Sequence, residues 1–291
     1  MESQALSPPT IGAILTFGLI ALMVFWIGWR RKFFLFSQSS WEFPLRFSHL
    51  IVAFAIYFFA SFFSSLIFMT LLKSKTTSSY IDLASWFNFS TSGIILASLL
   101  AYWRLLPEKI RLAIWLRPSE KEHLFSEDLC TAFLAWFISF PFVLFLSNLL
   151  EYLIFAISRQ SQLPDQLAVQ FLKMTFAHPL HLLLAALSII FFAPLIEELL
   201  FRGFLQSFIR QHLGSKQAIL ITSACFALFH YSKDQGLGNI PVICSLFILS
   251  LFLGFLYEKR GSLLAPITLH ASFNAISVIN LYFLGGIHGG I

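Results

Sequence analysis

The chain is built mainly from apolar stretches that are each about as long as a membrane-spanning helix. A helix needs roughly 20 residues to cross the roughly 30 Å hydrocarbon core of a bilayer. Such stretches lie at about residues 9–29, 48–72, 84–103, 129–157, 179–204, 217–231, 240–257 and 262–284. They do not alternate as β-barrel strands do, and helices satisfy every backbone amide in lipid. The sequence therefore predicts an all-α polytopic membrane protein with about eight transmembrane helices.

Composition supports this class and excludes others. Of the 291 residues 58% are hydrophobic and 11% are charged, whereas soluble domains have roughly 45–50% apolar and 25% charged residues. The net charge of +5 is not gathered in a basic tract. It indicates contact with anionic membrane lipid and gives no sign of a nucleic-acid partner. Cys130, Cys225 and Cys244 lie in spans without a Cys-x-x-Cys pair, so no disulfide framework or thiolate metal site is expected.

The distribution of Lys and Arg predicts a topology. The loops after the first, third, fifth and seventh spans hold 14 of these residues when Arg202 of the buried motif is counted with them, and the other loops and the tail hold 5. By the positive-inside rule the first set faces the cytoplasm, so both termini lie outside. The first span is followed by the positive residues Arg30, Arg31 and Lys32, whereas a secretory signal peptide has its positive residues before the apolar stretch. We therefore expect this helix to remain in the mature protein. The plasma (inner) membrane is the expected location.

No linker or low-complexity tract interrupts the spans. We expect residues 1–126 to form the first three helices together with an amphipathic cytoplasmic segment from Arg104 to Asp128, near the lipid headgroups. Residues 127–291 would form the core with the remaining five helices. No internal repeat is evident of the kind that builds many transporters.

Two adjacent carboxylates, Glu197 and Glu198, lie within an otherwise apolar span. A charge near the bilayer centre costs from about 3 to more than about 10 kcal/mol, so an intramembrane carboxylate indicates a functional site. Two more polar clusters occupy later spans, from Phe226 to His230 and from His270 to Asn274.

The three clusters are expected at one depth. At 1.5 Å per residue, Glu197 lies about 14 Å, His230 about 10 Å and His270 about 12 Å below the cytoplasmic edge. Spacings of four residues place Glu198 with Arg202, and His270 with Asn274, on shared helix faces. We therefore expect an active site inside the bundle, opening toward the cytoplasm.

These residue types suit hydrolysis, which requires a base for water and donors for the developing oxyanion. We assign Glu197 as the base, with His230 holding or deprotonating the water, and His270 and Asn274 as oxyanion donors. Glu198 and Arg202 are interpreted as a buried ion pair that fixes helix geometry, which by itself is weak evidence for function. Asn274 taken alone could equally bond to a neighbouring helix, at about 1 kcal/mol.

The same residues resemble the motifs of the CPBP (Abi) family of intramembrane proteases, which includes the CAAX prenyl proteases of the Ras-converting type. The pattern E-E-x-x-[FY]-R appears as Glu197 to Arg202, F-x-x-x-H as Phe226 to His230, and H-x-x-x-N as His270 to Asn274. The resemblance covers roughly residues 127–284. It implies an eight-helix endopeptidase in which the first Glu and the first His activate water and the last His and Asn form the oxyanion hole.

The metal content is a separate question, because the family is often labelled a metalloprotease. Glu197, His230 and His270 could form a His₂Glu zinc set. No His-Glu-x-x-His helix is present, and the resemblance to the CAAX enzymes implies a metal-free, glutamate-dependent site. We therefore expect no cofactor, with zinc as the alternative.

The sequence as a whole predicts an endopeptidase that cleaves a peptide or membrane-protein substrate, lipidated or not. Two other classes stay open. A proton-coupled transporter also uses intramembrane Glu and His residues. A catalytically silent membrane scaffold or immunity protein would keep the same motifs without turnover.

Overall fold

The computed structural model describes residues 9–35, 45–72, 77–116, 124–160 and 163–283. This part of the chain is helical, with one isolated β-bridge between Leu116 and Ser262. In chain order the elements are α1 (Ile11–Arg30), α2 (Phe47–Leu72), α3 (Thr77–Leu105), α4 (Glu108–Trp115), α5 (Phe125–Ser158), α6 (Leu167–Thr175), α7 (Pro179–Leu187), η1 (Ser188–Phe192), α8 (Ala193–Glu198), η2 (Leu199–Gln206), α9 (Ser207–Leu213), α10 (Ser215–Phe229), η3 (Lys233–Gly238), α11 (Asn239–Arg260) and α12 (Leu264–Phe283). Of these, η1 and η2 are π-helices and η3 is a 3₁₀-helix.

The described residues contain seven helical stretches that are long and apolar enough to cross a membrane. They are Ile11–Arg30, Phe47–Leu71, Tyr80–Leu105, Phe125–Ser158, Pro179–Leu213, Lys233–Arg260 and Leu264–Phe283. The stretch predicted at 217–231 corresponds to α10, an apolar helix of 15 residues. The protein is an all-α, polytopic integral membrane protein, as the sequence predicted.

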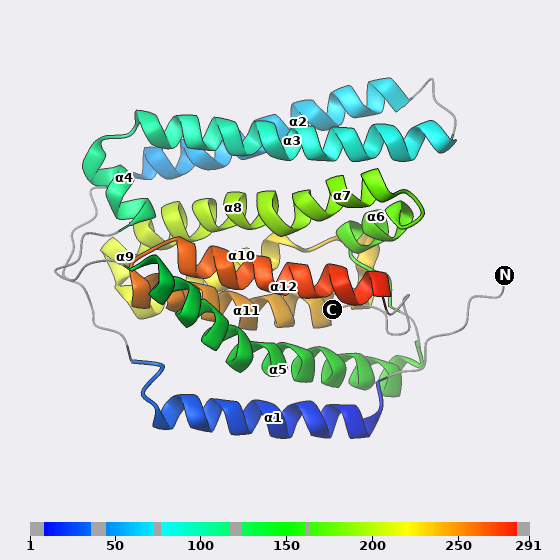
Figure 1. The fold of residues 1–291 in the computed structure, drawn as a ribbon, viewed down its shortest axis with the longest axis vertical. Coiled ribbons are helices and arrows are strands. Elements are labelled where there is room, and N and C mark those ends of the chain that lie inside the picture. Colours follow the sequence, from blue (N-terminus) through cyan, green and yellow to red (C-terminus); the bar gives the residue numbers. More distant parts are fainter. Residues whose placement is uncertain (1–8, 36–44, 73–76, 117–123, 161–162, 284–291) are drawn as a thin grey trace.

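The long helices run side by side as a bundle, with the start of α1 and the end of α12 at the same end (Figure 1). Helix α5 packs against α1 on one side and against α11 and α12 on the other. The α2–α3 pair lies on the opposite side of the core, where α2 contacts η2 and α3 contacts α7, η1 and α8 (Figure 1). The helices that carry the predicted site, α8, α10 and α12, are therefore flanked on both sides.

Helix α4 docks on the protein core through its apolar side. Ile110, Ala113 and Ile114 are buried. The Tyr257 hydroxyl donates to the carbonyl of Ile114 at 2.9 Å, and the Leu263 amide donates to the carbonyl of Trp115 at 3.1 Å. The amphipathic pattern of this segment thus reflects packing on η2 and α11, while residues 117–123 of the predicted cytoplasmic segment lie outside the described part.

Two π-helical stretches flank the short helix that carries the adjacent carboxylates. Helix α8 has η1 before it and η2 after it, within one continuous helical run from Pro179 to Leu213. A π-helical turn holds an extra residue and so rotates the following side chains about the helix axis, and such turns are frequent at functional sites. The sequence predicted a regular helix here, because spacing and hydropathy do not reveal π-helical turns.

Candidate active site

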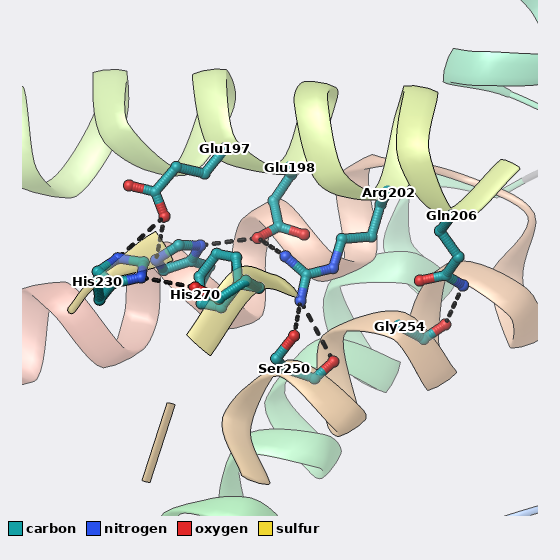
Figure 2. Close-up of polar contacts among 9 residues, drawn as sticks. Glu197, Glu198, Arg202, Gln206, His230, Ser250, Gly254 and His270 are labelled. Carbon is teal, nitrogen blue, oxygen red and sulfur yellow. Dashed lines mark hydrogen bonds and ion pairs between the residues drawn. The ribbon is translucent and has the colours of Figure 1, made fainter. Parts of the chain in front are cut away.

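The structure brings Glu197, His230 and His270 together from three helical segments (Figure 2). Oε2 of Glu197, near the end of α8, lies 3.8 Å from Nε2 of His230, which caps α10. The same oxygen lies 3.8 Å from Nε2 of His270 in α12. It is buried and has no hydrogen-bond partner among the described residues. The clustering that was predicted from depth is thus present.

His230 is held by the backbone of its own helix. Its Nδ1 lies 2.9 Å from the carbonyl oxygen of Phe226, four residues earlier. A carbonyl only accepts hydrogen bonds, so Nδ1 carries the proton in this contact. In the neutral imidazole, Nε2 is then an unprotonated acceptor. The nitrogen that faces Glu197 can therefore accept a hydrogen bond.

His270 is held by the second carboxylate. Its Nδ1 lies 2.8 Å from Oε1 of Glu198. The same oxygen accepts from Nη1 of Arg202 at 3.0 Å, which is the ion pair expected from their four-residue spacing. The side chains of Glu198 and Arg202 are 0% exposed. Glu198 therefore connects Arg202 to His270 and orients the imidazole toward Glu197, a second role that the sequence did not indicate.

Phe226 forms an aromatic support for this cluster, as its place in the motif suggested. Its ring lies 4.9 Å from the ring of His230 and 5.8 Å from that of His270. The guanidinium carbon of Arg202 lies 4.6 Å from the centre of the same ring, within the range of a cation–π contact. Phe226 is fully buried, so it fixes the positions of these three side chains by packing.

A row of polar contacts joins η2 to α11 and continues the cluster. Nη2 of Arg202 donates to Oγ of Ser250 at 2.6 Å and to its carbonyl at 3.3 Å. Nε2 of Gln206 donates to the carbonyl of Gly254 at 3.0 Å (Figure 2). It also donates to Oε1 of Glu258 at 3.0 Å. A Cβ at Gly254 would lie 2.8 Å from Oε1 of Gln206. The two helices therefore approach closely, and this approach fixes Arg202.

Sequence reasoning missed Ser250 as a supporting residue. A signal exists, because Ser250, Gly254 and Glu258 are four residues apart and form one small or polar stripe along the otherwise apolar α11. A helix that presents such a stripe in lipid usually packs it against another helix. The partner, however, is set by the tertiary fold and not by spacing.

Asn274 lies four residues after His270 in α12 and bonds to a neighbouring helical stretch. Its Nδ2 donates to the carbonyl of Ile189 in η1 at 2.8 Å. No hydrogen bond joins Asn274 to Glu197, His230 or His270, all of which are described. The amide thus anchors α12 to the π-helical stretch before α8, and it retains a second N–H. Its role as an oxyanion donor stays a prediction.

The two ring nitrogens of His270 face two different carboxylates. Nδ1 lies beside Glu198 and Nε2 faces Glu197. An imidazole that carries a proton on each nitrogen can therefore donate in both directions, to Glu198 and toward Glu197 or a substrate oxygen.

Glu197, His230 and His270 are also the residues of the alternative His₂Glu zinc set. Nε2 of each histidine lies 3.8 Å from Oε2 of Glu197, and Nδ1 of His270 contacts Glu198. Among the described residues, no group of three or more His, Cys, Asp or Glu side chains is arranged to hold a metal ion. We therefore derive no catalytic step through a metal.

Residues 179–276 match the family model of the Rce1-like type II CAAX prenyl endopeptidases. The match runs from the start of α7 into α12 and contains every residue of the predicted site. No curated protein and no solved structure matches the chain. The resemblance inferred from the three motifs is thus confirmed over these residues.

Proposed function

We propose that the protein is an intramembrane endopeptidase in which Glu197 activates water for attack on a peptide bond. One observation carries this proposal. Oε2 of Glu197 is buried, has no hydrogen-bond partner in the described part of the chain, and faces Nε2 of both histidines at 3.8 Å. A buried carboxylate oxygen without a partner is costly to a fold, which favours a catalytic explanation.

The first step of the proposed reaction is the activation of water between two hydrogen-bond acceptors, Glu197 and His230. Glu197 and neutral His230 both accept hydrogen bonds, and a water molecule has two O–H donors. A water between them is oriented by both groups. Glu197 removes one proton as the water oxygen forms a bond to the carbonyl carbon. The protonated Glu197 then transfers that proton to the leaving amine as the C–N bond breaks.

The oxyanion is stabilised on the other side of the site. His270, oriented by Glu198, presents Nε2 as a donor when it is protonated, and the second N–H of Asn274 supplies another. Donors fixed in a water-poor site cost little reorganisation when charge develops. Arg202 maintains this arrangement through Glu198 and does not touch the substrate.

The substrate class is a peptide or membrane protein whose scissile bond reaches this depth. The family match supports peptide substrates in general. The excess of Lys and Arg in alternate loops supports a cavity that faces the cytoplasm, with both termini outside. We propose the plasma (inner) membrane as the location. We further propose that residues 127–291 carry the chemistry.

Cleavage by the purified protein in liposomes tests this proposal. The substrates are a farnesylated peptide with a CAAX-type C-terminus and the same peptide without the lipid, and products are identified by mass spectrometry. We expect wild type to cleave at least one peptide, Glu197→Gln to cleave neither, and a zinc chelator to leave the rate unchanged. Absence of cleavage together with Glu197-dependent proton flux across the liposome would instead identify a transporter.

A further inference from the structure

A cavity of about 520 Å³ lies where the end of α3 meets α4. It is lined by Ala97, Leu100, Ala101, Trp103, Arg104 and Trp115. Its volume is within the range of small-molecule sites, roughly 300–1,000 Å³. None of these residues belongs to the cluster around Glu197, so the cavity is a separate feature of the molecule.

The cavity wall changes from apolar to charged along α3. Ala97, Leu100 and Ala101 lie inside the stretch that can cross the membrane, Tyr80–Leu105, whereas Arg104 is in its last turn and is exposed. Two small side chains one turn apart leave a shallow channel beside the helix. A ligand that fits this wall has an apolar chain on the membrane side and a polar group at the helix end.

Two tryptophans mark the level of the membrane surface at this corner. The rings of Trp103 and Trp115 lie 5.6 Å apart, and Nε1 of Trp103 donates to the carbonyl of Arg111 at 3.2 Å. Tryptophan is enriched where the hydrocarbon core meets the headgroups. The charged end of the cavity therefore lies at headgroup level.

The charge of this corner selects an anion. Arg104 lines the cavity, and the guanidinium carbon of Arg111 lies 6.0 Å from the centre of the Trp103 ring. Nε of Arg111 is buried and has no hydrogen-bond partner among the described residues. Guanidinium groups bind phosphate through paired N–H donors. Arg104 in the lining, together with Arg111 next to the lining residue Trp103, favours a phosphate that carries net charge over a zwitterionic headgroup.

We propose that this cavity binds one anionic phospholipid of the bilayer, with an acyl chain along Ala97, Leu100 and Ala101 and its phosphate at Arg104 and Arg111. The lipid would join the end of α3 to α4, which itself packs on η2. It would thus stabilise the side of the bundle that adjoins the catalytic cluster. The proposal does not depend on the protein's being a protease.

Native mass spectrometry of the full-length protein in mild detergent tests this binding. Phosphatidylglycerol or phosphatidylcholine is added, and the fraction of protein that retains one lipid is measured. We expect roughly thirtyfold stronger retention of phosphatidylglycerol, since each of the two Arg residues contributes about 1 kcal/mol with anionic lipid. Arg104→Gln should lower this preference about fivefold. Ala101→Leu, which fills the cavity and keeps both charges, should lower the retention of phosphatidylglycerol.

Arg46→Gln is the matched control, because Arg46 is also exposed next to a spanning helix but does not line the cavity. It should keep the preference. Equal retention of the two lipids by wild type would overturn the proposal, as would equal losses in Arg104→Gln and Arg46→Gln. If Arg104→Gln is not recovered as folded protein, full retention by Ala101→Leu would overturn it independently.

Discussion

Oε2 of Glu197 lies 3.8 Å from Nε2 of His230. Direct hydrogen bonds join such atoms at about 2.7–3.2 Å, and a polar contact longer than about 3.5 Å is commonly bridged by water. The same oxygen has the same separation from Nε2 of His270. One carboxylate oxygen thus faces both histidines. The proposed activation of water depends on this geometry.

Glu198→Gln should lower kcat without unfolding the protein. The amide can still accept from Nδ1 of His270, but it lacks the negative charge that Glu198 places between His270 and Arg202. Misplacement of a catalytic group by about 1 Å can cost about 10²-fold in rate. The measurement is kcat and KM on the cleaved peptide. We expect KM to stay within about threefold, because Glu198 does not touch the substrate. A variant with wild-type kcat would remove Glu198 from the mechanism.

Arg202→Met should destabilise the fold, because it leaves the fully buried Glu198 without its cationic partner. Breaking a buried pair from one side typically costs about 3–5 kcal/mol. The double variant Glu198→Gln/Arg202→Met should recover much of the thermal stability in detergent but not the activity. Equal stability of the single and double variants would show that the pair does not support the fold.

The membrane spans and the Glu198–Arg202 ion pair could be predicted from the sequence, because both depend on local spacing. The length of the apolar stretches predicted the spans. The four-residue separation of Glu198 and Arg202 predicted their ion pair, which measures 3.0 Å. Depth along the helices predicted that Glu197 and the histidines meet. The Glu198–His270 contact was not predictable, since depth says nothing about which way one helix turns toward another.

The π-helical stretches explain a further part of what the sequence could not show. Faces predicted with 3.6 residues per turn no longer apply after η1 and η2, which hold an extra residue per turn. Asn274, in the regular helix α12, donates to Ile189 within η1, which is the bond to a neighbouring helix that the sequence left open as an alternative. The burial of Gln206 against Gly254 likewise depends on the close approach of η2 and α11.

The Asn274→Ala variant distinguishes two roles of Asn274, as an anchor between helices and as an oxyanion donor. Loss of one oxyanion donor lowers kcat by about 10²–10³-fold, whereas loss of an interhelical hydrogen bond costs about 1 kcal/mol of stability. We expect both effects, measured as turnover per folded protein and as the thermal midpoint. A lowered midpoint with unchanged turnover would assign Asn274 to anchoring alone.

Gly254→Ala should destabilise the bundle by about 1–3 kcal/mol, the usual effect of overpacking. The added methyl group would lie 2.8 Å from Oε1 of the buried Gln206, which cannot move without loss of its bonds to Gly254 and Glu258. Gly12→Ala is the control, because its nearest atom is 3.9 Å away. Equal thermal midpoints for the two variants would contradict the close approach of η2 and α11.

The most direct test of the central claim compares protein termini in cells that produce wild type, Glu197→Gln or Glu151→Gln. Glu151 is a second carboxylate within a spanning helix, where it accepts from Ser147 at 2.9 Å, away from the histidines. Quantitative mass spectrometry of newly formed termini is the measurement, at matched amounts of each variant. The account predicts fragments of membrane-associated proteins that are present with wild type and Glu151→Gln and absent with Glu197→Gln. Fragments that persist unchanged with Glu197→Gln would contradict it.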